Sequence, residues 1–110
     1  MAQAKYELFD KKLTEQANFF KALAHPARLQ ILKFLAESKS CITCDISDEL
    51  PLGRTTVNQH IKELKAIGLI SGHTEGSTTK YCLNPEKIAL LKNVLNCFLS
   101  NFDTENYTCK

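Results

Sequence analysis

Two helical patterns separated by a tight turn occupy residues 43–67, and they constrain the fold more than any other feature of the sequence. Residues 43–50 predict a short helix and residues 54–67 a longer one, because apolar side chains recur in both at intervals of three or four. Between them, Pro51-Leu52-Gly53 is typical of a turn. Two amphipathic helices joined this closely predict a helix-turn-helix. The apolar anchors of the two helices are Ile46, Leu50, Val57, Ile61 and Leu64.

The flanking sequence predicts further elements around this motif. Pro26 follows a break at His25 and begins one helix, and Asn84-Pro85-Glu86 begins another, because proline fits the first helical position and Asn can cap it. Gly68 ends the helix before it as a left-handed cap, and two short β-branched runs then predict a β-hairpin. The predicted fold is mainly α with a small β-hairpin, in the order α-α-α-α-β-β-α, as one domain over residues 1–110. The remaining predicted elements are helices at 9–24 and 26–36, a hairpin or wing at about 69–83, and a helix at 85–102.

The outer face of the helix at 54–67 carries side chains that suit DNA. Arg can bind guanine through two hydrogen bonds, and Asn or Gln can bind adenine in the same way. Thr and Lys can hold phosphates, and the hairpin can lie over the adjacent DNA backbone. A polar helix face also occurs on unrelated small α-helical domains, and a winged fold can serve protein interaction without DNA. The predicted DNA-binding residues are Arg54, Thr55, Thr56, Asn58, Gln59, Lys62 and, in the hairpin, Lys80.

Several motifs resemble the ArsR/SmtB family of bacterial repressors. They are the segment Phe20–Leu32, the run Thr55–Leu64 with Gly68-Leu69-Ile70 after it, and Lys80-Tyr81-Cys82-Leu83 at the end of the hairpin. The resemblance covers about residues 10–100. It implies a dimeric winged helix-turn-helix repressor that leaves its operator, a double-stranded DNA site, when an inducer of metal, metalloid or sulfur stress binds. It also assigns base-facing positions to Arg54, Thr55, Asn58 and Gln59, and it matches His25 and His60 to family histidines. We expect His60 to be packed beside the turn rather than to contact a base, and His25 to be structural rather than a ligand.

The first and last helices supply the dimer contacts in the family that the sequence resembles. The helix at 85–102 agrees with this expectation, because its apolar residues recur at steps of three and four, close to a heptad seam. We therefore expect a homodimer that pairs through residues 9–24 and 85–102. The predicted interface residues are Leu13, Phe20, Ile88, Leu91, Leu95, Phe98 and Phe102.

The sequence Cys41-Ile42-Thr43-Cys44 is the candidate sensor. Soft thiolates favour thiophilic ions such as arsenite or antimonite, and Cys44-Asp45-Ile46 resembles the second cysteine of the family's arsenic site. The family spaces its pair by one residue, whereas two residues separate Cys41 from Cys44. A third ligand would have to come from Cys97 or Cys109. The alternatives are a disulfide of Cys41 with Cys44 or Cys97, and plain buried thiols; Cys82 is expected to be packed on its strand.

Other classes of protein fit the sequence poorly. The chain of 110 residues contains no glycine-rich phosphate loop and no arguable nucleophile–base–acid order, so we expect no enzyme and no required cofactor. Its apolar runs are far shorter than the roughly 20 residues of a membrane helix, and no signal segment begins it. These features predict a cytoplasmic protein without a membrane partner. The net charge of +2 neither requires nor excludes nucleic acid.

Overall fold

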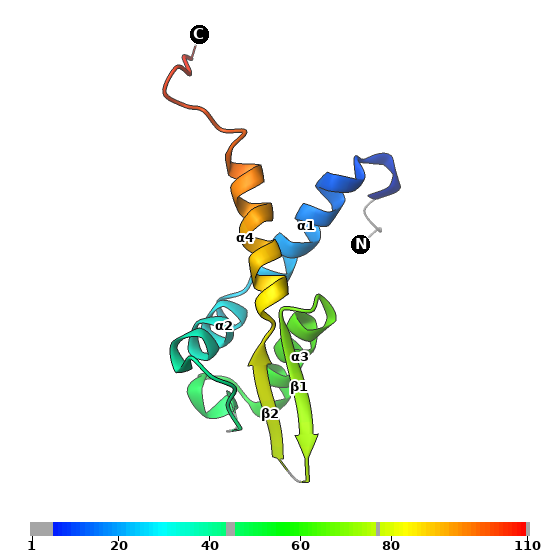
Figure 1. The fold of residues 1–110 in the computed structure, drawn as a ribbon, viewed down its shortest axis with the longest axis vertical. Helices are drawn as coiled ribbons and strands as arrows, with labels where there is room; N and C mark the ends of the chain where they lie inside the picture. Colours follow the sequence, from blue (N-terminus) through cyan, green and yellow to red (C-terminus); the bar gives the residue numbers. More distant parts are fainter. Residues whose placement is uncertain (1–5, 44–45, 77, 110) are drawn as a thin grey trace.

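The computed structural model describes residues 6–43, 46–76 and 78–109, and Figure 1 shows how the elements are arranged. The order of the elements agrees with the sequence prediction, apart from short 3-10 helices at two places. The elements are η1 (Tyr6–Leu8), α1 (Lys11–Leu23), α2 (Pro26–Ser38), η2 (Ile46–Glu49), α3 (Arg54–Ala66), β1 (Ile70–Glu75), β2 (Thr78–Leu83) and α4 (Pro85–Leu99).

Local side-chain chemistry sets the helix ends. The side chain of Asp10 caps α1 by accepting from the Lys12 N–H, and Asn84 caps α4 by accepting from two backbone N–H groups. The helix α2 ends at Ser38, and the capping residue Lys39 adopts the left-handed conformation with φ 57°. Gly68 lies just past α3 with φ 85°, as predicted, where an L side chain would be strained. The strands and the last helix therefore start at positions that the sequence itself defines.

One hydrophobic core joins α1, α2, η2, α3, the hairpin and α4. Its largest fully buried side chains come from α2, η2, α3 and the segment after α3. The core residues are Phe19, Ile31, Leu35, Ile46, Val57, Ile61, Leu64, Leu69, Ile70 and Leu91. The helix α3 therefore packs against the body of the domain along one face.

The helices α1 and α4 project from the end of the molecule that is opposite the tip of the hairpin (Figure 1). An aromatic cluster joins them: the Phe20 and Phe98 ring centroids are 5.3 Å apart, and those of Phe98 and Phe102 are 5.2 Å apart. Edge-to-face pairs of this kind stabilise by more than their buried area alone. Among the described residues, none of the helices is both long enough and apolar enough to cross a bilayer.

In α1, Phe19 is buried in the core of its own chain, whereas Leu13, a residue of the predicted dimer interface, is 49% exposed. One predicted helix was wrong: the described part of the segment 43–50 contains only the 3-10 helix η2, which begins at Ile46.

Candidate nucleic-acid interface

The helix α3 has one buried and one exposed face. Val57, His60, Ile61 and Leu64 are the buried residues of this helix. At about 100° per residue these four fall within one arc of about 100°, and the predicted contact residues Thr55, Asn58, Gln59 and Lys62 fall within a similar arc on the opposite side. All four are exposed, as are Arg54 and Thr56, which flank them. The exposed face therefore presents hydroxyl, amide and cationic groups together.

The buried stripe of α3 sets which of its faces points outward. Leu64 is fully buried, and its carbonyl accepts a hydrogen bond from the N–H of Leu69, which is also fully buried. At the other end the Gly53 carbonyl accepts from the Val57 N–H at 3.0 Å, which is the first backbone bond of the helix. Because the stripe packs into the core of the domain, the polar face on the other side of α3 is directed outward.

Two histidines and one arginine connect α3 to the helices before it. The His25 side chain caps α2, since its Nδ1 accepts from the Ala27 N–H at 3.0 Å. The His25 and His60 ring centroids are 4.1 Å apart. The Arg28 Nε donates to His60 Nδ1 at 3.2 Å, and its Nη1 donates to the carbonyls of Lys21 and Ala22. His60 is therefore a buried residue, as expected, whereas His25 is exposed and has the structural role of capping α2.

The environment of His60 disfavours its charged form. Burial lowers the pKa of His60 from its usual 6.5, and the neighbouring His25 and Arg28 lower the pKa further. A proton on Nδ1 would also replace the lone pair that accepts from the Arg28 guanidinium. An unfolded chain therefore binds this proton more readily than the folded one below pH 6.5, so the stability of the fold rises with pH across that window and falls as the pH drops below it.

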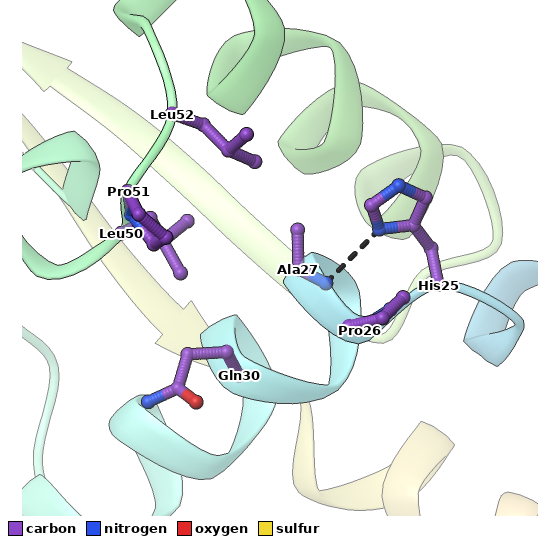
Figure 2. Close-up of a pocket in the computed structure, with 7 residues that line it drawn as sticks. All are labelled: His25, Pro26, Ala27, Gln30, Leu50, Pro51 and Leu52. Atoms are coloured by element: carbon purple, nitrogen blue, oxygen red, sulfur yellow. Dashed lines mark hydrogen bonds between the residues drawn. The ribbon is translucent and has the colours of Figure 1, made fainter.

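An open pocket lies beside the turn that leads into α3. Its volume is about 450 Å³, and it separates the beginning of α2 from residues 50–52 (Figure 2). Figure 2 shows that the Nδ1 of His25 already accepts a hydrogen bond from the Ala27 N–H. The lining is otherwise mainly apolar, so it offers packing surface rather than reactive groups. The lining residues are His25, Pro26, Ala27, Gln30, Leu50, Pro51 and Leu52.

The hairpin extends from the core beside α3. Its strands β1 and β2 pair antiparallel over six residues each, with Ile70 opposite Leu83 and Glu75 opposite Thr78. Lys80, the predicted contact of the wing, is half-buried on β2 opposite His73. Ile42 pairs with Tyr81 on the free edge of β2 through two backbone hydrogen bonds. The hairpin is thereby attached to the segment that precedes η2.

Comparison with known proteins identifies the class of protein to which this architecture belongs. The family model described as "Bacterial regulatory protein, arsR family" matches residues 25–71. An HTH-type transcriptional regulator of Methanocaldococcus jannaschii is 36% identical over 78 residues, which cover 71% of this chain and 88% of the relative. The chain belongs to the arsR family. The expectation from the sequence motifs is confirmed, and the chain is a DNA-binding transcriptional regulator rather than an enzyme.

Further arsR-family proteins are similar over most of the chain. The arsenical resistance operon repressor of Bacillus subtilis is 34% identical over 79 residues, which cover 71% of this chain and 75% of the repressor. The solution structure of a homodimeric winged helix-turn-helix DNA-binding domain of Mycobacterium bovis has a TM-score of 0.62 and 25% identity. That alignment covers 99% of this chain and 100% of the M. bovis domain. The fold is therefore a winged helix-turn-helix, as predicted.

The predicted dimer residues of this arsR-family chain lie on α1, on α4 and just past α4. Leu13 and Phe102 are exposed, while Ile88, Leu95 and Phe98 are half-buried. Phe20 is half-buried against Phe98. Leu91 is 8% exposed and belongs to the core of its own chain, so little of its surface is left for a partner. Leu90 and Leu99, which were absent from the predicted interface, are exposed beside it.

The structure gives the cysteines an arrangement that the sequence did not predict. Cys41 forms a disulfide with Cys82, with a Cα–Cα distance of 4.4 Å, whereas Cys44 lies outside the described residues. Cys97 and Cys109, the candidates for a third ligand, are free and exposed. Within the described ranges, no three His, Cys, Asp or Glu side chains gather as a metal site. Cys82 was expected only to pack on its strand. Its disulfide with Cys41 can be inferred only when it is known that Ile42 pairs with Tyr81 on the edge of β2.

Proposed function

We propose that this chain is a homodimeric repressor that reads an operator with α3, holds the adjacent backbone with the hairpin, and is released by a thiophilic compound. The observation that carries the proposal is the composition of the exposed face of α3, which stands opposite its buried stripe. Asn58 and Gln59 are suited to base edges, and Arg54 to guanine, whereas Thr55, Thr56 and Lys62 are suited to phosphates. Lys80 would reach the backbone from the hairpin.

Dimerisation through α1 and α4 is supported by apolar surface at that end of the molecule. Leu13 lines a shallow, almost wholly apolar hollow of about 210 Å³ with Phe9, Thr14 and Ala17. Leu99 and Phe102 are 58% and 59% exposed on and just past α4. The M. bovis domain with the same fold is a homodimer. A second copy of this chain is therefore the proposed occupant, and the two copies would present two α3 helices to successive major grooves about 34 Å apart.

The proposed release of the repressor from its operator depends on the thiols of Cys41 and Cys44. Cys41 is exposed and stands three residues before Cys44 in the sequence, at the entrance to the helix-turn-helix. Two thiolates there would suit arsenite or antimonite, with Cys97 or Cys109 as a third ligand after rearrangement. The similarity to the B. subtilis arsenical resistance repressor supports this choice of inducer. A tenfold loss of operator affinity requires a coupling free energy of only about 1.4 kcal/mol.

DNA binding is tested with the duplex of the chain's own promoter in a fluorescence anisotropy titration at several salt concentrations. We expect Asn58→Ala to weaken operator binding by about 1–3 kcal/mol and to relax sequence preference at one base pair. Lys92→Ala, which removes an exposed charge on α4, is the control and should bind as the wild type does. A wild-type chain without measurable duplex affinity at low salt would indicate a protein-interaction module instead.

Dimerisation and release are tested separately. Leu13→Glu should yield a folded monomer in sedimentation, while Leu29→Glu, at a similarly exposed leucine on α2, should remain dimeric. For release, the complex with the duplex is titrated with arsenite in the presence of a thiol-free reductant. Cys41→Ser and Cys44→Ser should each abolish release, and Ser40→Ala should not. Release that persists in both cysteine variants would refute the proposed inducer site.

A further inference from the structure

Backbone pairing, rather than the sulfur–sulfur bond alone, brings Cys41 and Cys82 together. Ile42 and Tyr81 exchange two backbone hydrogen bonds, of 3.0 and 2.7 Å, across the edge of β2. The next pair in the same antiparallel register is Cys41 with Cys82, at a position without hydrogen bonds, where Cα atoms are typically about 4.5 Å apart. The observed Cα–Cα distance is 4.4 Å. The two thiols of the reduced chain would thus remain neighbours as long as this pairing persists.

The bond connects two segments that also pair through one backbone bridge, between Ile42 and Tyr81. On one side is the loop after α2, and on the other is the second strand of the hairpin. The chain between the two cysteines contains η2, α3 and β1, which is most of the proposed DNA-reading unit. Without the disulfide, the backbone pairing described on this edge is the one bridge between Ile42 and Tyr81, whose side chains also pack against the core.

The pair is accessible to reagents in solution. Cys41 is exposed and Cys82 is half-buried, so an oxidant can reach the first sulfur while the second is held beside it. Exposed disulfides exchange more readily with external thiols than buried ones do. Cys97 and Cys109 are also exposed, but both are free and lie on α4 and beyond it. Among the described cysteines, Cys41 and Cys82 therefore combine an exposed residue with a partner that the backbone holds beside it.

We propose that Cys41 and Cys82 form a reversible thiol–disulfide site that hydroperoxides oxidise and that sets operator affinity by fixing the hairpin. A hydroperoxide transfers one oxygen to the Cys41 thiol, which gives a sulfenic acid and an alcohol, or water from hydrogen peroxide. The Cys82 sulfur then attacks the Cys41 sulfur, the S–S bond forms and water leaves. The two thiols lose two electrons and two protons in total. Two equivalents of a small cellular thiol reverse the reaction by exchange and become a disulfide themselves.

The oxidised state is the state with the higher expected affinity. A disulfide between the loop and β2 restricts the hairpin to the orientation beside α3 before DNA arrives, so less conformational freedom is lost on binding. We expect the oxidised chain to bind the duplex about three- to tenfold more tightly than the reduced chain. This inference rests on the proposed function, because it concerns the same DNA-reading unit.

The first experiment identifies the bond without using DNA. The reduced full-length chain is treated with hydrogen peroxide, remaining thiols are alkylated, and peptides are mapped by mass spectrometry. We expect a peptide pair joined through Cys41 and Cys82, with Cys97 and Cys109 alkylated. A bond between Cys41 and Cys44, or bonds only through Cys97 or Cys109, would overturn the assignment.

The second experiment measures the affinity of both redox states for the promoter duplex. Cys41→Ser and Cys82→Ser should each bind with the affinity of the reduced wild type whether or not peroxide is added, while Lys92→Ala, at an exposed residue on α4, should respond as the wild type does. Equal affinities of the two wild-type states, or weaker binding after oxidation, would overturn the proposed effect on the hairpin. If neither state binds DNA, the proposed function fails, and the mapped disulfide still decides whether the redox site exists.

Discussion

The disulfide between Cys41 and Cys82 allows one stability prediction to be worked out from the structure. Its two cysteines are 41 residues apart in the chain. In the chain-entropy account, closing a loop of that length lowers the entropy of the unfolded chain by about 13 cal/mol/K, which is about 4 kcal/mol at room temperature. At about 2.1 cal/mol/K per residue, the unfolding entropy of 110 residues is about 230 cal/mol/K. Dividing the free energy of about 4 kcal/mol by this entropy gives a Tm difference of about 17 °C. Cys82→Ser should therefore lower the Tm of the oxidised chain by about that amount.

Differential scanning calorimetry of the oxidised and reduced proteins measures this difference. Reductant should lower the Tm of the wild type to that of Cys82→Ser and should leave the variant unchanged. Cys97→Ser is the matched control, since it removes a free thiol on α4 and should keep the wild-type response. The loop-closure argument is refuted if oxidised wild type and Cys82→Ser unfold within about 4 °C of each other, because that gap corresponds to only about 1 kcal/mol.

Three further predictions concern α3 and its supports. Leu64→Ala should lower the free energy of unfolding by about 2–5 kcal/mol in urea denaturation, because Leu64 is fully buried. Because the pKa of His60 is lowered in the fold, the wild type should lose stability as the pH falls below 6.5, and His60→Gln should flatten this dependence in thermal unfolding scans while His73→Gln, on the exposed hairpin, should not. Lys62→Ala should weaken binding to all duplexes alike and reduce the slope of log affinity against log salt by about one, whereas Asn58→Ala should leave that slope unchanged.

Local chemistry made the helix boundaries predictable. Pro26, Asn84-Pro85 and Gly68 each act on their own neighbours, through a fixed φ, a side-chain cap or a left-handed backbone, and no distant contact is needed to interpret them. The polar face of α3 could also be predicted from the sequence, because the buried positions of this helix follow from helical periodicity alone. Thus the sequence was sufficient for the arsR-family fold and for a set of candidate contacts.

The buried face of α1 was not predictable for a physical reason. This helix has apolar side chains on more than one face, and periodicity cannot tell which face packs on its own chain and which is left for other surfaces. The sequence therefore did not show that Phe19 packs in the core of its own chain while Leu13 stays exposed. The disulfide partner of Cys41 could not be predicted from the sequence either. The pairing with Cys82 depends on a strand register between segments that are far apart in the sequence.

The hydrogen bonds of Arg28 couple the position of α1 to that of α3. One guanidinium holds the last turn of α1 through the carbonyls of Lys21 and Ala22, and also holds the inner side of α3 through His60. A helix that turns about its own axis, or that slides along it, must therefore break these bonds or carry the other helix with it. In the proposed homodimer, a small tilt of α1 would therefore also change the angle and separation of the two α3 helices that are proposed to read DNA.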